Sequence, residues 1–257
     1  MDLNLANKTA LITGASKGIG KGIAMAMAEE GCDIILVSRT LVELNKAATD
    51  ITNAHNVNVR VFAKDLSVIG SVVELIEEAG TPNILVNNAG AIPGGSLELV
   101  EEERWRESWE LKVFGYINMC RTFYAAMKKQ GHGVIINVTG LAGERLDANY
   151  IAGSSGNAGL NAFTRALGSK NLSDGIRVLA VSPGACETKR LVGLMRTKAE
   201  AEYGDPEHWQ SYLGGLPLGR AATVCEVAEV VTFMSSERAS YMSGVIIPVD
   251  GGYGANN

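Results

Sequence analysis

The chain has 257 residues, of which 46% are hydrophobic and 20% are charged, and its formal net charge is −5 at pH 7. This composition is that of a globular protein with a substantial core. The acidic balance and the lack of a long basic run argue against nucleic acid as a partner. No apolar run approaches the ~18 residues of a membrane span, and no secretory signal is visible. We therefore expect a cytoplasmic protein without a membrane partner.

Cysteine and histidine are sparse. The four cysteines form no C-x-x-C pair, and the three histidines are scattered along the chain. A metal site or a framework of disulfides would need clustered ligands at characteristic spacings. We expect no metal.

Short apolar runs alternate with segments of helical periodicity. The first strand is expected in TALITG (residues 9–14), followed by a helix from Gly18 that ends at Gly31. Further strands are expected at 33–38, 57–63, 83–90, 133–139, 176–184 and 244–250, and further helices up to about 52 and at about 71–80, 101–129, 150–172 and 224–235. Residues 186–220 have an irregular pattern. Strict alternation predicts one α/β domain, doubly wound around a parallel sheet.

The turn after the first strand, TGASKGIG, is rich in glycine. Gly14, Gly18 and Gly20 stand where a strand passes into a helix, so the backbone can approach a pyrophosphate closely at the helix N-terminus. An ordinary tight turn is the alternative, but the position directly after a first strand favours dinucleotide binding.

The end of the second strand indicates which dinucleotide is bound. An acidic residue there would bind the ribose hydroxyls, whereas this chain has Ser38 and Arg39, with Lys17 inside the glycine-rich turn. These two cations favour NADP(H), and NAD(H) is the less favoured cofactor. The alternative is that Arg39 is only a solvated charge at a helix start.

Several motifs in a fixed order resemble the short-chain dehydrogenase/reductase family. They are TGASKGIG (13–20), Asp65-Leu66, NNAG (87–90), ANY (148–150), SPG (182–184) with Thr188, and VDGG (249–252). The resemblance implies a single Rossmann-type domain over residues 1–257 with a seven-stranded sheet, and a homotetramer or homodimer. It also implies that residues 186–220 cover a small-molecule substrate.

The resemblance further implies a set of cofactor-binding residues along these motifs. The set is Gly14, Ser16, Lys17, Gly18, Ile19, Gly20, Ser38, Arg39, Asp65, Leu66, Asn88, Ala89, Gly90, Tyr150, Pro183, Gly184 and Thr188.

The active-site pattern of the family is altered in this chain. Members usually carry a serine, a tyrosine, a lysine four residues after the tyrosine, and an asparagine in an earlier helix. Tyr150 matches the tyrosine, but Ser154 stands at the lysine position and Lys112 at the asparagine position. The serine position is Gly140, with Thr139 as its hydroxyl neighbour.

Lys112 is a candidate to replace the lysine missing at position 154. A tyrosine has a pKa of about 10, so proton transfer near neutral pH needs a nearby positive charge. The flexible stem of a lysine on a facing helix can deliver that charge. The alternative is an ordinary solvated helix lysine. Thr139 is the candidate to hold the substrate oxygen, and Ser154 the candidate to bond a ribose hydroxyl.

The sequence therefore predicts an NADP(H)-dependent oxidoreductase. It would interconvert a carbonyl, of the ketone or 3-oxoacyl type, and a secondary alcohol by hydride transfer, with Tyr150 as the proton donor. The missing serine and lysine leave open an alternative from another class, a catalytically weak NADP-binding sensor or assembly subunit.

Overall fold

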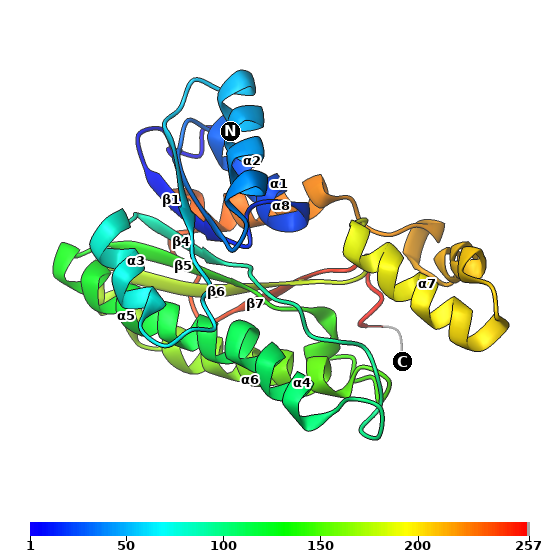
Figure 1. Cartoon of the computed structure of the whole chain (residues 1–257). Coiled ribbons are helices and arrows are strands. Elements are labelled where there is room, and N and C mark those ends of the chain that lie inside the picture. Colours follow the sequence, from blue (N-terminus) through cyan, green and yellow to red (C-terminus); the bar gives the residue numbers. More distant parts are fainter. Residues whose placement is uncertain (256–257) are drawn as a thin grey trace.

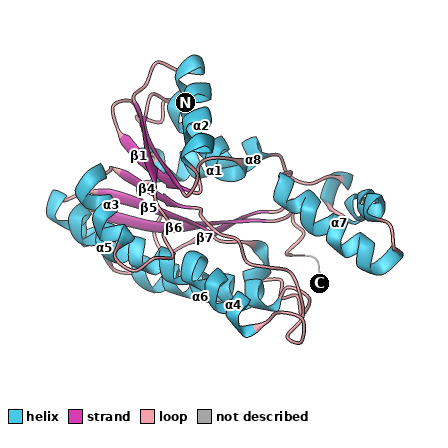
Figure 2. Ribbon diagram, viewed as in Figure 1, coloured by secondary structure: helices cyan, strands magenta, loops and turns pink. Residues whose placement is uncertain are grey.

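The computed structural model describes residues 1–255, which form a seven-stranded parallel sheet with helices on both faces (Figures 1 and 2). Across the sheet the strand order is β3-β2-β1-β4-β5-β6-β7. The strands are β1 (Thr9–Thr13), β2 (Asp33–Ser38), β3 (Val59–Ala63), β4 (Ile84–Asn87), β5 (Gly133–Val138), β6 (Ile176–Pro183) and β7 (Ile246–Val249). The predicted doubly wound α/β fold is confirmed.

The helices divide between the two faces of the sheet. Their bounds are α1 (Gly18–Glu29), α2 (Leu41–Ala54), α3 (Ser71–Ala79), α4 (Glu102–Trp109), α5 (Gly115–Gln130), α6 (Ile151–Gly168), α7 (Lys189–Tyr203) and α8 (Val224–Ser235). Helices α1, α2 and α8 pack on one face, and α3, α5 and α6 on the other (Figure 1). No helix of residues 1–255 has both the length and the apolar character needed to cross a membrane.

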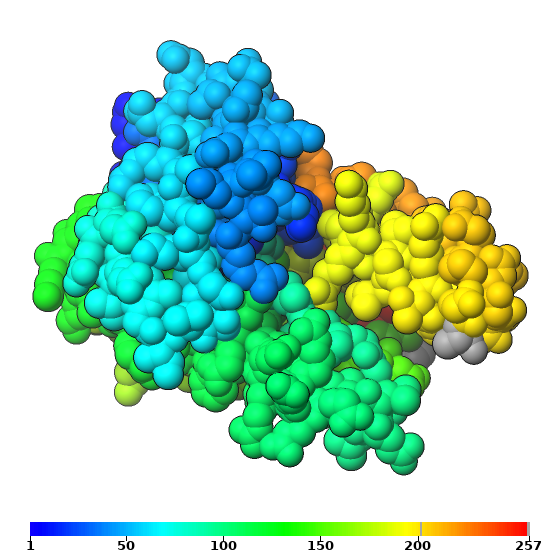
Figure 3. Space-filling model, in the orientation of Figure 1, coloured from blue at the N-terminus to red at the C-terminus, as the bar shows by residue number. Residues whose placement is uncertain are grey.

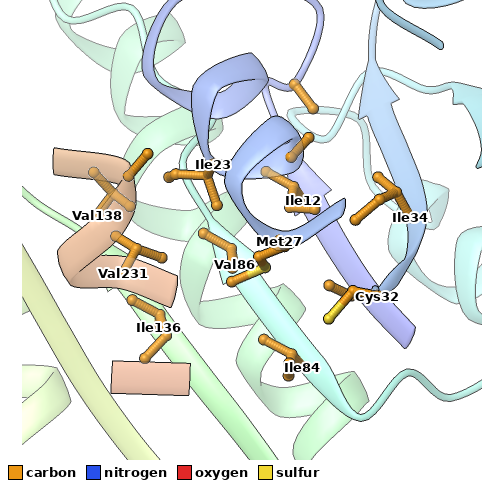
Figure 4. Packing of buried hydrophobic residues seen from close by; sticks show 14 of the residues in the cluster. Ile12, Ile23, Met27, Cys32, Ile34, Ile84, Val86, Ile136, Val138 and Val231 are labelled. Carbon is orange, nitrogen blue, oxygen red and sulfur yellow. The ribbon is translucent and has the colours of Figure 1, made fainter. Parts of the chain in front are cut away.

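Each face of the sheet has its own apolar core, because helices cover both sides of the central parallel strands. In the first core, residues of α1 and α8 pack against β1, β4 and β5 (Figure 4). The labelled members are Ile12, Ile23, Met27, Cys32, Ile34, Ile84, Val86, Ile136, Val138 and Val231. In the second core, Leu75 of α3 and Phe123 of α5 pack against Leu11 and Leu85 on the opposite face.

Two segments differ from the sequence prediction. The helix expected over residues 101–129 is divided by a π-helical turn at Glu110–Phe114, where Gly115 N–H donates to the carbonyl of Glu110. Residues 186–220, expected to be irregular, contain the fifteen-residue helix α7. Helix α7 lacks a continuous apolar stripe because it covers the molecule rather than entering its core, so periodicity did not reveal it.

Thr13 joins the ends of the two central strands. Its hydroxyl oxygen accepts the N–H groups of Asn88 and Ala89 at 2.9 and 3.0 Å and donates to Val86 O. The Asn88 side-chain amide in turn donates to the carbonyls of Thr13, at 3.0 Å, and Gly14, at 3.3 Å. The glycine-rich turn and the NNAG loop are thereby held against each other at the carboxyl ends of β1 and β4.

We predict that Thr13→Val lowers the free energy of unfolding by about 1–3 kcal/mol, because valine has the shape of threonine but offers no acceptor to the two loop N–H groups. Urea unfolding measures this change. Thr52→Val, on the exposed side of α2, is the control and should change stability by less than about 0.5 kcal/mol. Equal stability of the two variants would contradict the assigned role of Thr13.

Candidate functional site

The glycine-rich turn has the geometry of a phosphate cradle. Gly14 and Gly18 have φ of +64° and +57°, values that favour glycine. A Cβ atom at Gly20 would lie 2.4 Å from Gly14 O, so no side chain fits there. Helix α1 begins without a side-chain cap at Lys17, which leaves the N–H groups of its first turn free to bind an anion. These residues fit the pyrophosphate of a dinucleotide.

The loop after β6 faces the same turn. A Cβ at Gly18 would lie 3.5 Å from Cγ2 of Thr188, and the Thr188 hydroxyl accepts the N–H of Leu191 as the N-cap of α7. Pro183 ends β6, and Gly184 N–H donates to Val249 O at 3.0 Å. The space-filling view shows a hollow between the yellow α7 segment and the blue N-terminal part of the chain (Figure 3). Of the predicted cofactor residues in this loop, Thr188 therefore lies opposite the glycine-rich turn.

The residues predicted to hold the adenosine lie at the ends of β2 and β3. Ser38 pairs with Ala63 in the sheet register, and Leu66 is buried. Burial raises the pKa of the Asp65 carboxyl, but hydrogen bonds from Ser67 and the charge of Arg39 outweigh this effect and leave it below the ordinary value. The charge of Arg39 makes the smallest of these contributions.

An acidic residue that the sequence analysis missed lies beside the phosphate cradle. Glu43, in the first turn of α2, forms an ion pair with Lys17 at 3.1 Å and accepts the Ser16 hydroxyl at 3.3 Å. The end of β2 carries no acid, as expected, but α2 brings a carboxylate to the same place. The sequence feature that could have revealed Glu43 is its position in the first turn of α2, the helix that follows β2.

Lys112 is buried, with 8% of its surface exposed, in the π-helical turn. Its Nζ donates to Val138 O at 2.7 Å, to the Tyr116 hydroxyl at 3.1 Å and to Thr139 O at 3.3 Å. π-Helical turns frequently occur at functional sites because the extra residue redirects a side chain. The alternative of an ordinary solvated helix lysine is wrong.

Gly90 of the NNAG loop makes room for Lys112. A Cβ atom at Gly90 would lie 2.6 Å from Cδ of Lys112 and 3.5 Å from its Nζ. Burial lowers the pKa of Lys112 to about 7, and the positive charge of Arg190 adds to this shift. Burial raises the pKa of Tyr116 well above its usual value, so its hydroxyl stays protonated and donates to Val138 O at 3.0 Å. A lysine with a pKa near 7 can both donate and accept a proton at neutral pH.

Tyr150 stands at the N-cap of α6 and is half-buried. A Cβ at Gly153 would lie 2.0 Å from Cε1 of Tyr150, so the ring rests on the first turn of the helix where only glycine fits. Tyr150 forms a parallel bridge with Gly95. Within residues 1–255 no hydrogen bond joins Tyr150 to Lys112, but Trp109, three residues before Lys112, donates its indole N–H to Ala152 O at 3.0 Å and joins the two segments.

The two remaining candidates have hydroxyls committed to backbone groups. The Thr139 hydroxyl donates to Val181 O at 3.4 Å, while its own carbonyl accepts from Lys112. The Ser154 hydroxyl accepts the N–H of Asp147 at 3.0 Å and donates to Asp147 O at 3.2 Å. Ser154 therefore holds the loop in front of Tyr150, a contact that spacing along the sequence did not reveal.

Arg190, also missed by the sequence analysis, joins α7 to the loop after β4. Its guanidinium donates to Ile92 O at 2.5 Å and to Gly90 O at 3.5 Å. Leu194, one turn later, lies 3.7 Å from the position of a Cβ at Gly94. Helix α7 thus closes over the loop that adjoins Lys112, and only this tertiary contact distinguishes Arg190 from other surface arginines.

We predict that Lys112→Met stabilises the protein at neutral pH, by on the order of 3 kcal/mol. Because the pKa of Lys112 falls from 10.5 to about 7 on folding, the protonated lysine disfavours the folded state. This penalty is complete below about pH 7 and disappears as the pH rises toward the unfolded pKa. Methionine removes it, and Tyr116 still donates to Val138 O.

Urea unfolding at about pH 7 and about pH 9.5 tests this prediction. The stability advantage of Lys112→Met should shrink at the higher pH, whereas the exposed control Lys129→Met should show no such trend. An advantage that is independent of pH, or a destabilised variant, would contradict the burial of a titrating ammonium.

The chain is similar to known proteins over nearly its whole length. A family model described as enoyl-(acyl carrier protein) reductase matches residues 14–254. The 3-oxoacyl-[acyl-carrier-protein] reductase of Escherichia coli is 33% identical over 254 residues, covering 97% of this chain and 98% of that protein. The galactitol 2-dehydrogenase of Cereibacter sphaeroides is 30% identical over 95% of this chain and 94% of that protein.

Among solved structures, the L-sorbose reductase of Gluconobacter frateurii in complex with NADPH and L-sorbose superimposes with a TM-score of 0.89. It is 30% identical, and the match covers 98% of both chains. The matches run through the glycine-rich turn, the NNAG loop and the tyrosine helix. The chain therefore belongs to the short-chain dehydrogenase/reductase family of oxidoreductases.

Proposed function

We propose that the protein is an NADP(H)-dependent oxidoreductase that interconverts a ketone or 3-oxoacyl-type carbonyl and a secondary alcohol. The observation that carries the proposal is a tyrosine at the start of α6 together with a buried lysine beside Gly90 of the NNAG loop. The alternative, a catalytically weak NADP-binding subunit, is not favoured, because the relatives are named as reductases and dehydrogenases.

When bound, the nicotinamide cofactor supplies or accepts the hydride. Tyr150 gives its hydroxyl proton to the substrate oxygen in reduction and takes it back in oxidation. Because Gly153 has no side chain, the Tyr150 ring can pack on the first turn of α6. The Ser154 hydroxyl fixes the preceding loop by accepting the N–H of Asp147. Thr139 lies beside Lys112, and its hydroxyl orients a substrate carbonyl oxygen by turning from Val181 O and donating to that oxygen instead.

Lys112 takes the role of the lysine that position 154 lacks. Its ammonium approaches from the π-helical turn rather than from the turn after Tyr150. The role of its protonated form is to stabilise the phenolate of Tyr150, since opposite charges attract more strongly in a partly buried site than in water. With a pKa of about 7 it also exchanges protons readily at neutral pH.

Two features support NADP(H) as the cofactor and residues 186–220 as the substrate-covering segment. Arg39 and Lys17 supply positive charge where the 2′-phosphate would lie, and the L-sorbose reductase structure is described as a complex with NADPH. Helix α7 lies over the loop after β4 through Arg190. A homotetramer or homodimer stays a prediction from the family.

Activity is tested by following NADPH consumption with a panel of ketoses, simple ketones and 3-oxoacyl thioesters. We predict that at least one class is reduced and that Tyr150→Phe abolishes this turnover. Because phenylalanine retains the ring and loses only the acidic hydroxyl, NADPH affinity should stay within about threefold of the wild type. Near-native kcat in Tyr150→Phe would assign proton transfer to another group, and tight NADPH binding with no carbonyl reduced would favour the non-catalytic alternative.

For Lys112, we predict that Lys112→Met lowers kcat by about 10²-fold or more. In alcohol oxidation Tyr150 must be deprotonated, so loss of the nearby charge should also shift the rise of activity to higher pH. The double variant Lys112→Asn/Ser154→Lys, which rebuilds the usual family arrangement, should recover part of the lost activity.

Ser154→Ala is the control for the double variant, since it removes the contact with Asp147 without adding a charge. Folding and NADPH affinity of each variant are checked by circular dichroism and by fluorescence titration. A folded Lys112→Met enzyme with normal turnover and an unshifted pH profile would exclude Lys112 from catalysis.

A further inference from the structure

We propose that Glu43 competes with the 2′-phosphate of NADP(H) for Ser16 and Lys17, and so limits how strongly the protein prefers NADPH over NADH. The inference rests on the proposed function, since it concerns the same cofactor site. It assigns cofactor discrimination to a residue of α2, rather than to the end of β2 alone.

The contacts of Glu43 are made with two of the predicted cofactor residues. Both of its carboxylate oxygens accept from Lys17 Nζ, at 3.1 and 3.2 Å, and one also accepts from the Ser16 hydroxyl at 3.3 Å. An anion bound by Ser16 and Lys17 would need the same donors. The carboxylate therefore occupies the coordination that a phosphate would take.

The ion pair between Lys17 and Glu43 is charged and exposed to solvent, so it can open. The hydrogen bond from Lys17 and its charge, with smaller help from Ser16 and Lys189, hold the pKa of Glu43 below its ordinary value, so the carboxylate stays ionised at neutral pH. Both partners are exposed, with 71% of the Lys17 side chain and 43% of the Glu43 side chain accessible. Exposed ion pairs of this kind contribute little to stability and exchange partners easily.

The two cofactors should respond differently to this carboxylate. A 2′-phosphate must displace Glu43 from Ser16 and Lys17 and then lies close to a second anion, which repels it. NADH has hydroxyls in the same place, so Glu43 can keep its contacts or accept from the ribose. Glu43 thus weakens the binding of NADPH more than that of NADH.

A second ion pair between the same helices provides a matched comparison. Lys21 of α1 pairs with Asp50 of α2, and neither residue belongs to the predicted cofactor site. Neutralising Asp50 changes the net charge by the same amount as neutralising Glu43 and removes an equivalent helix-to-helix link. Any effect specific to Glu43 must therefore come from its contacts with the glycine-rich turn.

The experiment measures the dissociation constants of NADPH and NADH by fluorescence titration for the wild type, Glu43→Gln and Asp50→Asn. We expect Glu43→Gln to bind NADPH about five- to tenfold more tightly and NADH within about twofold of the wild type. Asp50→Asn should leave the ratio of the two constants within about twofold. Titration with 2′,5′-ADP and 5′-AMP should show the same difference without the nicotinamide.

The proposal is overturned if Glu43→Gln leaves the NADPH/NADH ratio unchanged, if it weakens NADPH binding, or if Asp50→Asn widens the ratio equally. The wild-type titration separates this result from the proposed function. Equal wild-type affinities with selective tightening in Glu43→Gln would support the role of Glu43 while removing the NADP preference. Binding of neither cofactor by any of the three proteins would overturn both proposals.

Discussion

The reversal of winding between β1 and β4 is the constraint on which the rest of the structure depends. These strands are neighbours in the sheet, yet the chain leaves them towards opposite faces, so the segments after them separate and leave a crevice at their carboxyl ends. At this crevice, the hydroxyl of Thr13 accepts the N–H groups of Asn88 and Ala89 and so holds the NNAG loop against the end of β1. Cofactor cradle, tyrosine helix and α7 all meet there.

The crevice holds the buried ammonium of Lys112. Its hydrogen bonds only partly offset the free energy lost when the group leaves water. Lys112 exchanges water for two carbonyls and the hydroxyl of Tyr116, and no carboxylate is among its hydrogen-bond partners in residues 1–255. Hydrogen bonds to neutral groups do not replace hydration fully, so its pKa falls to about 7. The buried ammonium of Lys112 destabilises the folded protein. A buried ionisable residue with a strongly shifted pKa is typical of a functional site.

Charge at the other end of the crevice is arranged differently. Lys17 and Glu43 neutralise each other at the surface, where water screens the pair and an incoming phosphate can exchange with one partner. In the proposed cofactor site, a buried and hydrogen-bonded lysine would thus serve the nicotinamide end, and an exposed ion pair the adenosine end. The two places differ electrostatically because Lys112 is buried, whereas Lys17 and Glu43 lie at the surface.

The sequence by itself determined the alternation of strands and helices and the glycine-rich turn between β1 and α1, because these depend on periodicity and on glycine at fixed positions within a few residues. Tyr150 was singled out by the resemblance to the family. It also placed Lys112 at the asparagine position of the family. Only the tertiary structure decided that the buried side chain of Lys112 packs against Gly90. It also decided that the Ser154 hydroxyl accepts the N–H of Asp147. It likewise decided that Glu43 reaches Lys17 and that α7 forms a helix over the loop after β4. These contacts join residues far apart in the chain, and their energies depend on burial and distance, which a linear pattern does not contain.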